Sequence, residues 1–103
     1  MKIVAVTSCP SGVAHTYMSA ESLALSAKKY GIDIKVETQG SSGIENELTA
    51  EEIKEAACVI LTNDVEIRNM DRFKGKKVVK MGVSDIIKKS DALIKTIKET
   101  FDK

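Results

Sequence analysis

Apolar and polar residues along the chain form patterns typical of strands that alternate with helices. Continuous apolar runs at Ile3–Val6 and Ala57–Thr62 indicate central strands covered on both faces. The segment Ile32–Thr38 alternates apolar residues with charged ones, including Glu37, which indicates a half-buried strand near a sheet edge. A fourth strand is predicted at Lys77–Met81.

Helical patterns separate these strands. Residues from about Val13 to Tyr30 suit a helix, because small and apolar residues recur at three- and four-residue steps. The members of this stripe are Val13, Tyr17, Ala20, Ala24 and Ala27. Thr49–Glu52 is a capping box and predicts a short helix from there to about Glu55. The last segment is an amphipathic helix, and either Ser84 or Ser90 could cap its start.

Strands that alternate with helices imply right-handed crossovers and a parallel sheet. We therefore predict one α/β domain over residues 1–103, a small doubly wound, three-layer fold with a four-stranded parallel sheet in the order 2-1-3-4. Gln39–Leu48 is predicted to be a loop, and Asn63–Phe73 an irregular segment with at most one helical turn. Both follow strands and should meet Cys9 at the carboxyl edge of the sheet, where ligands bind in such folds. Asp64 either faces this edge or caps a turn or helix.

Composition and charge exclude several classes of function. The net charge of +1 and the four aromatic residues give little support for nucleic-acid binding. The longest apolar run, Ala56–Leu61, is far shorter than the ~20 residues needed to span a bilayer, and the N-terminus has no signal-peptide pattern. We therefore expect a cytoplasmic protein without direct membrane insertion. The single histidine and two distant cysteines make a poor zinc set, so we expect no metal and no cofactor.

Cys9 is the candidate nucleophile. It lies in a Ser-Cys-Pro-Ser-Gly loop between the first strand and the first helix. The helix dipole and the unpaired backbone N–H groups at such a position favour the thiolate over the thiol. The same N–H groups can hold a phosphate-sized dianion. Our interpretation is that Cys9 becomes covalently phosphorylated, whereas Cys58, inside the third predicted strand, is expected to be structural.

The residues that follow Cys9 help to distinguish a phosphoryl carrier from a cysteine-dependent phosphatase. Cysteine-dependent phosphatases have Cys-x5-Arg-Ser/Thr, but here His15 stands at the arginine position and Thr16 follows it. The loop also has no carboxylate to activate water, which favours a phosphocysteine that hydrolyses slowly. His15 either donates to the phosphate or lies near solvent, and Ser8, Ser11 and Thr16 are either phosphate donors or turn and cap residues. A phosphatase-like enzyme and a phosphate-binding regulatory module remain as alternatives.

The loop and two further motifs resemble a known family. Cys9–Thr16 reads CPSGVAHT and resembles the CPTG(I/V)AHT active-site loop of the B components of the fructose-type bacterial sugar phosphotransferase system, with serine in place of threonine at the third position. Val36–Gly43 looks like the family's VETQGS-x-G segment, and Asp64 and Arg72-Phe73 match its D…RF elements. The likeness extends over nearly the whole chain up to Lys77.

This resemblance implies a phosphoryl relay. A phosphohistidine on the partner A component would donate to Cys9, and the phosphocysteine would pass the group to sugar, by default fructose, held by the membrane C component. The phosphate-binding loop carried over from the family consists of Pro10, Ser11, Gly12, Val13, Ala14, His15 and Thr16. The chain would then be a phosphotransferase, peripheral to the membrane through the C component, and either a separate subunit or a domain excised from a fused protein.

Overall fold

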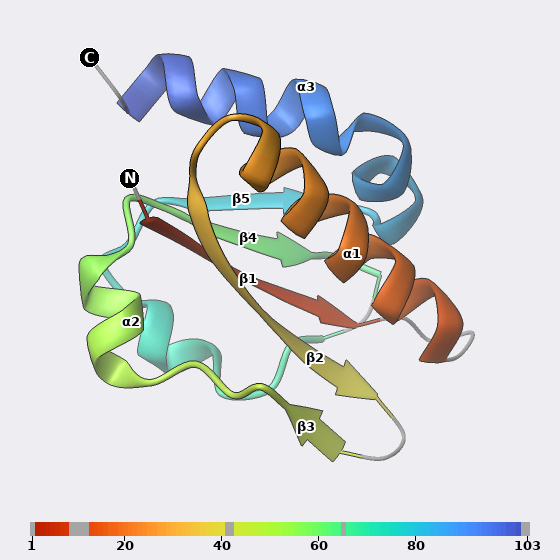
Figure 1. Cartoon of the computed structure of the whole chain (residues 1–103). Helices are drawn as coiled ribbons and strands as arrows, with labels where there is room; N and C mark the ends of the chain where they lie inside the picture. Colours follow the sequence, from red (N-terminus) through yellow and green to blue (C-terminus); the bar gives the residue numbers. More distant parts are fainter. Residues whose placement is uncertain (1, 9–12, 41–42, 65, 102–103) are drawn as a thin grey trace.

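A five-stranded mixed sheet forms the centre of the molecule (Figure 1). The computed structural model describes residues 2–8, 13–40, 43–64 and 66–101. The strands are β1 (Lys2–Ser8), β2 (Asp33–Gly40), β3 (Gly43–Glu45), β4 (Val59–Thr62) and β5 (Val78–Met81). Their order is β3-β2-β1-β4-β5, and only β3 runs antiparallel to its neighbour.

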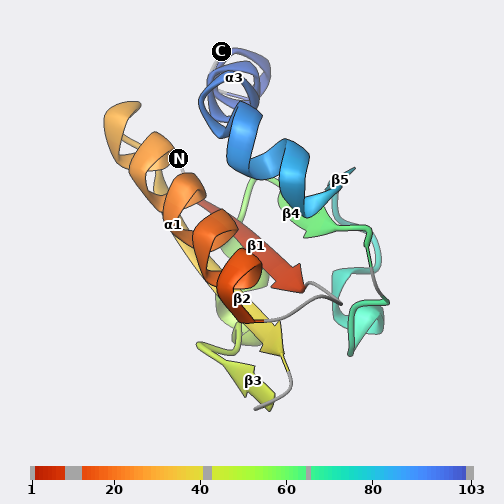
Figure 2. The same ribbon diagram turned by 90° about the vertical axis from the view of Figure 1, so that its right-hand side faces the viewer.

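Helices cover both faces of this sheet (Figure 2). The helical elements are α1 (Val13–Lys29), α2 (Ala50–Glu55), the 3-10 helix η1 (Met70–Phe73) and α3 (Val83–Phe101). On β1, Ile3 packs in the cluster with α1 and α3, whereas Val4 and Val6 pack on the other face with α2 and η1. All three side chains are fully buried, and burial of this kind contributes about 1.5–3 kcal/mol per residue. The predicted central strand and three-layer α/β fold are confirmed.

The predicted strand order is right, but the strand count is wrong. The four parallel strands follow the predicted order, since β2-β1-β4-β5 corresponds to 2-1-3-4. However, the segment predicted as the Gln39–Leu48 loop contains β3, which pairs Gln39 with Ile44 and Gly40 with Gly43. Gly43 has φ 107°, which glycine adopts without strain. A three-residue strand is too short to show periodicity, and its presence moves β2 away from the sheet edge.

The buried face of α1 also differs from the predicted alanine stripe. Tyr17 of that stripe is 42% exposed. Ala27 of the stripe is buried as predicted, but the other buried positions of α1 are mostly hydroxyl residues, namely Thr16, Ser19, Leu23 and Ser26. Ser19 Oγ donates to Thr16 O at 2.8 Å, and Ser26 Oγ donates to Ser90 Oγ on α3 at 3.1 Å. Because these hydroxyls have partners, serine can be buried here at little cost, and a stripe chosen by hydropathy misses it.

The start of α3 is set from another part of the chain. The helix begins at Val83, and Asp64 Oδ2 accepts a hydrogen bond from its backbone N at 2.6 Å. Neither Ser84 nor Ser90 therefore caps the start, and of the roles left open for Asp64 the structure shows the helix cap. Lys89 has non-helical angles, φ −120° and ψ 16°, so α3 bends just before Ser90.

The remaining elements lie where the sequence predicts them. α2 has the expected capping box, in which Glu52 N donates to Thr49 Oγ1 at 3.2 Å and Thr49 N donates to Glu52 Oε1 at 2.8 Å. β4 is buried throughout, β5 follows its turn, and η1 is the single helical turn expected before it. None of the helices that the structure describes has the length and apolar character needed to cross a membrane.

Candidate functional site

The carboxyl ends of three parallel strands meet at one edge of the sheet. β1 ends at Ser8 between β2 and β4, and the register places Ser8 beside Gln39. Cys9, Pro10, Ser11 and Gly12 lie outside the described residues, but they join Ser8 to the start of α1 at Val13. Cys9 therefore follows the strand at which the connections change direction, which is where ligands bind in sheets of this kind.

The end of β1 is held by a side chain of β4. Ser8 N donates to Thr62 Oγ1 at 2.9 Å, and Thr62 Oγ1 donates to Ser8 O at 3.1 Å. Both residues are buried, so these bonds are shielded from competing water. The residue that immediately precedes Cys9 is thus fixed to the neighbouring strand.

The first turn of α1 has the features of an anion site. This 17-residue helix carries no acidic residue in its first turn, so nothing there neutralises the positive end of its dipole. Thr16 in this turn is 2% exposed, and its Oγ1 has no hydrogen-bond partner among the described residues. An unpaired buried hydroxyl costs about 1–3 kcal/mol, so a group that accepts a hydrogen bond from Thr16 would be stabilised here. The side chains of Val13, Ala14 and His15 are not described, so the two roles considered for His15 stay predictions.

Cys58 is not a second reactive thiol. Its side chain is fully buried in the core cluster beneath α1 and α3. Burial raises the pKa of this thiol to about 11, only weakly opposed by the positive charge of Lys76. A thiol that stays protonated at neutral pH is a poor nucleophile, which confirms the structural role predicted for Cys58.

Glu37 is the site residue that sequence reasoning misplaced. The alternating pattern put it with the charged residues of a half-buried strand, yet its side chain is 0% exposed. Arg72 Nη1 donates to Glu37 Oε1 at 2.6 Å and Nη2 donates to Oε2 at 2.5 Å, while Leu48 N donates to Oε1 at 2.9 Å. Burial would raise the pKa of Glu37, but Arg72, the Leu48 amide and Gln39 together hold this pKa below its ordinary value. This ion pair thus joins two motifs of the sequence, VETQ, which contains Glu37, and RF, which contains Arg72.

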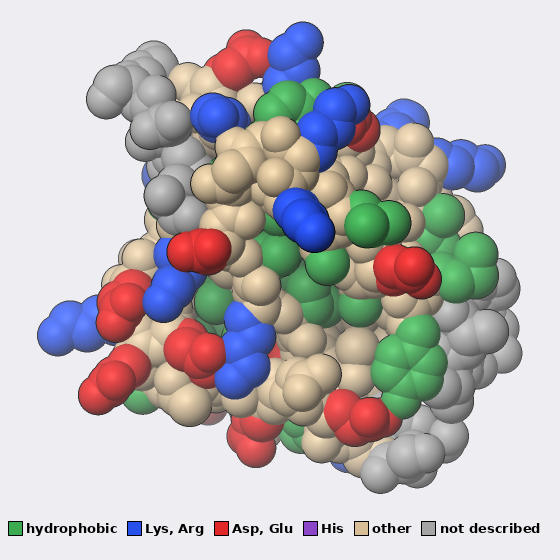
Figure 3. Space-filling model, in the orientation of Figure 1, with side chains coloured by type: hydrophobic (Ala, Val, Ile, Leu, Met, Phe, Trp, Pro, Cys, Tyr) green, Lys and Arg blue, Asp and Glu red, His purple; other side chains and the backbone are tan. Residues whose placement is uncertain are grey.

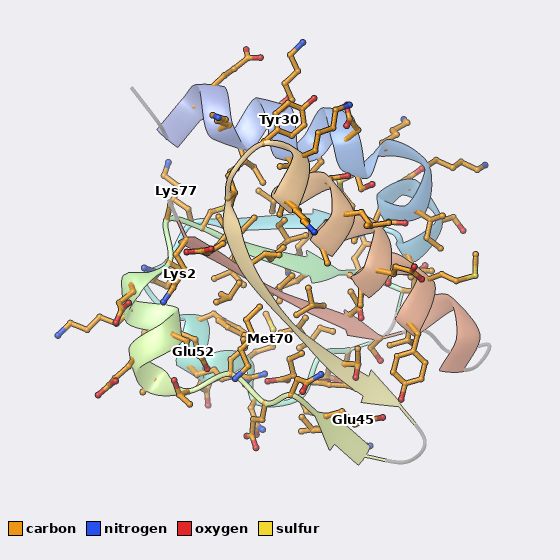
Figure 4. The ribbon with its side chains drawn as sticks, in the orientation of Figure 1. Lys2, Tyr30, Glu45, Glu52, Met70 and Lys77 are labelled. Atoms are coloured by element: carbon orange, nitrogen blue, oxygen red, sulfur yellow. The ribbon has the colours of Figure 1, made fainter. Side chains whose placement is uncertain are left out.

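A hydrogen bond between two side chains joins α1 to β3. The hydroxyl of Tyr17 donates to Glu45 Oε1, and Figure 4 shows where Glu45 lies on β3. This hydrogen bond, aided by partial desolvation and by the negative charge of Glu45, raises the pKa of Tyr17. The bond spans two elements that flank the segments containing Cys9 and Ser41, so it borders the same edge of the sheet.

Two hollows lie beside this edge. One of about 440 Å³ opens at the end of β4 among residues that include Thr62, Asn63 and Asp64. The other, of about 560 Å³, lies along Glu66–Asp71, before and within η1. Within residues 2–8, 13–40, 43–64 and 66–101, no three His, Cys, Asp or Glu side chains gather as a metal-binding group. The described site therefore combines a helix terminus with hydroxyl, amide and carboxylate side chains.

Comparisons with known proteins agree on IIB components of the phosphotransferase system, although the names of the matches give different sugars. The family model described as "PTS system, Lactose/Cellobiose specific IIB subunit" matches residues 4–96. The "PTS system fructose-like EIIB component 2" of Escherichia coli is 56% identical over 96 residues, which cover 93% of this chain and 91% of that protein. The "PTS system fructose-specific EIIABC component" of Bacillus subtilis is 50% identical over 93 residues, which cover 90% of this chain and 14% of that protein. A solved domain of fruA from Bacillus subtilis superposes with a TM-score of 0.86 at 45% identity, covering 96% of this chain and 94% of that domain.

Proposed function

The chain belongs to the IIB family of the sugar phosphotransferase system, among its fructose-type members, and from this premise we propose that it is a phosphoryl carrier that is phosphorylated on Cys9. Residues 1–103 would form a single IIB domain. The donor would be a phosphohistidine of the A component, and the acceptor would be sugar bound by the membrane C component. The A, B and C letters joined in the name of the Bacillus relative support these two partners, and its "fructose-specific" name supports fructose as the sugar.

The transfer is an exchange at phosphorus in two steps. The Cys9 thiolate attacks the phosphorus of the phosphohistidine, so that an S–P bond forms while the N–P bond breaks and the imidazole nitrogen keeps the bonding electron pair. In the second step a sugar hydroxyl attacks the same phosphorus and gives its proton to a base at the C component's sugar site, while the S–P bond breaks, its electron pair stays on sulfur and the thiolate is regenerated. The thiolate is both the nucleophile and the later leaving group, and no water takes part.

The observation that carries the proposal is the buried hydroxyl of Thr16 at the start of α1, which has no partner among the described residues. Cys9 lies seven positions earlier in the sequence, and the helix terminus between them supports binding of a dianion. In the proposal the phosphoryl group is held by backbone and side-chain donors of the loop Pro10, Ser11, Gly12, Val13, Ala14, His15 and Thr16. Such donors stabilise the charge that develops on the phosphoryl oxygens.

The exposed surface of α1 supports contact with a protein donor. Tyr17, Met18 and Leu25 are 42%, 49% and 62% exposed. Figure 3 shows this face of the molecule, with apolar side chains at the surface among charged ones. Large apolar side chains in such positions are typical of surfaces that meet another protein.

The proposal is tested by following the phosphoryl group. The protein is incubated with phosphoenolpyruvate, the general relay proteins and a cognate A component, and then analysed by intact mass and peptide mapping. We expect one phosphoryl group on Cys9, absent in Cys9→Ser, retained in the matched variant Cys58→Ala, and removed by sugar together with membranes that hold the C component. No adduct despite a phosphorylated A component would contradict the carrier and favour a phosphate-binding regulatory module. Steady release of phosphate from p-nitrophenyl phosphate would instead support a phosphatase.

Thr16→Val tests the assigned donor within the same assay. Valine has the shape of threonine but no hydroxyl, so the free protein should be as stable as the wild type or more stable. Loss of one such donor typically slows transfer about 100-fold. Thr16→Ser should retain most of the rate, whereas an unchanged rate in Thr16→Val would remove this hydroxyl from the site.

A further inference from the structure

The side-chain amide of Gln39 binds both backbone groups of Arg68. Gln39 Nε2 donates to Arg68 O at 3.2 Å, and Arg68 N donates to Gln39 Oε1 at 2.8 Å. The same Nε2 also donates to Glu37 Oε2 at 2.7 Å. Gln39 is only 3% exposed, so water does not compete strongly for these bonds. The Gln39 amide thus makes the pair of hydrogen bonds that the backbone of a neighbouring strand would make. It fixes the position of the backbone at Arg68.

These bonds join parts of the chain that lie on opposite sides of β1. Gln39 and Glu37 belong to β2, whereas Arg68 and Arg72 belong to the connection from β4 to β5. Since β1 lies between β2 and β4, this connection must pass the carboxyl half of β1 to reach β2. Figure 1 shows it returning from the end of β4 toward η1 and α2. It lies on the face opposite α1, where Ile67 and the other members of its cluster pack against β1.

We propose that Glu37, Gln39 and Arg72 are positioning residues that hold the segment 66–73 across the end of β1 and thereby fix the phosphoryl site from the face opposite α1. This inference rests on the proposed function of Cys9. The three residues do not touch the phosphoryl group; they act through Ser8, the last residue of β1, and through the segment beneath it. Ser8 is paired in register with Gln39 on one side and bonded to Thr62 on the other.

A purely structural role accounts poorly for this arrangement. A buried ion pair is often no more stabilising than apolar side chains of similar volume, so stability alone does not call for Glu37 and Arg72. The connection 63–77 contains only one short helical element among its described residues, and long irregular connections in compact folds are commonly functional. Its course depends on hydrogen bonds that specify geometry. Since a displacement of about 1 Å can cost up to about 100-fold in rate, a support of this kind matters directly for transfer.

The first test measures phosphoryl transfer from the phosphorylated A component to Gln39→Leu. Leucine keeps the volume and burial but cannot bind Arg68, so we expect transfer at saturating donor to slow about tenfold or more, with little change in the half-saturating donor concentration. Arg72→Lys is the second variant, since it keeps the charge but cannot hold both Glu37 oxygens. Glu52→Gln is the matched control, because it breaks a pair with Lys35, which is also on β2 but lies farther from the carboxyl edge. All variants are compared at a temperature at which circular dichroism shows them to be folded.

The second test does not require the relay. Alkylation of Cys9 by iodoacetamide is followed over pH in the free protein, with peptide masses separating Cys9 from Cys58. We expect the alkylation rate of Gln39→Leu to differ from that of wild type by threefold or more, or the midpoint pH of its profile to shift. The profile of Glu52→Gln should match that of wild type. A folded Gln39→Leu with wild-type alkylation and transfer would overturn the positioning role. If wild type takes up no phosphoryl group but its alkylation profile still depends on Gln39, the proposed function fails, and Gln39 is shown to position Cys9 without a phosphoryl site.

Discussion

Replacing Arg72 by leucine should lower the free energy of unfolding, because it leaves the buried carboxylate of Glu37 without its charged partner. In the wild type, Arg72 holds both oxygens of Glu37 and also stacks on Phe73, with its guanidinium carbon 4.7 Å from the ring centroid. Breaking a buried pair from one side typically costs 3–5 kcal/mol. The Leu48 amide and Gln39 still bond Glu37, and the Arg72 side chain is 17% exposed, so we expect the low end, about 3 kcal/mol at pH 7.

The pH dependence of this loss follows from the pKa of Glu37. In wild type the pKa is lowered despite burial, so the contribution of Glu37 is fully present above its unfolded pKa and is lost as the pH falls through the folded pKa. In Arg72→Leu, Glu37 is still buried but no longer has the guanidinium that lowered its pKa most, so the pKa of Glu37 in the folded state rises. Protonation then relieves the penalty. The stability difference between wild type and variant should therefore shrink by about 1 kcal/mol or more between pH 7 and pH 4.

Urea unfolding at both pH values measures this difference. With a slope of about 1.5 kcal/mol per M, a loss of 3 kcal/mol lowers the midpoint at pH 7 by about 2 M. Arg68→Leu is the matched control, because the Arg68 side chain is exposed and only its backbone is used, so its midpoint should stay near wild type. A loss below about 1 kcal/mol at pH 7, or a loss that grows toward pH 4, would refute the assigned charge pairing.

Three further predictions concern single groups. Because burial raises the pKa of Cys58 to about 11, iodoacetamide at pH 8 should label it only after unfolding, and rapid labelling of the native protein would contradict its burial. The pKa of Glu52 is lowered to about 2, chiefly by Lys35, so Glu52→Gln should lower the melting temperature above about pH 4.5, with the deficit vanishing toward pH 2; a deficit that persists there would exclude the charge as its cause. Asp64→Ala should destabilise the protein by about 1 kcal/mol through loss of the cap on Val83, read from urea unfolding, and Asp64→Asn should recover part of it.

The features that the sequence predicted are those specified by neighbours in the chain. β1 and β4 are continuous apolar runs, and the α2 capping box joins residues only three positions apart, so local patterns were sufficient. The position of Cys9 between a strand and a helix could likewise be predicted, because both flanking elements have strong local patterns. The parallel strand order then followed from the general rules for crossovers.

The features that were missed depend on partners far along the chain. Glu37 is buried because of Arg72, 35 positions away, and α3 begins where it does because of Asp64, 19 positions before its first residue. A pattern of alternating polarity cannot distinguish a solvated glutamate from one that is paired in the core. The same holds for Ser19 and Ser26 on α1, whose hydroxyls are satisfied by contacts that hydropathy does not register.

At the carboxyl edge of the sheet, the polar side chains on the two faces differ in how many of them have hydrogen-bond partners. On the face opposite α1, Glu37 accepts four hydrogen bonds and leaves nothing for a ligand. On the α1 face, Thr7 Oγ1 donates to Thr16 O, and Thr38 lies beside Thr7 in register, so its side chain points to the same face. The hydroxyls of Thr16 and Thr38 are both buried without partners among the described residues. The polar groups on the face opposite α1 are therefore paired with one another, whereas two hydroxyls on the α1 face are not paired among the described residues. We expect the phosphoryl group that we propose on Cys9 to be bound from the α1 side.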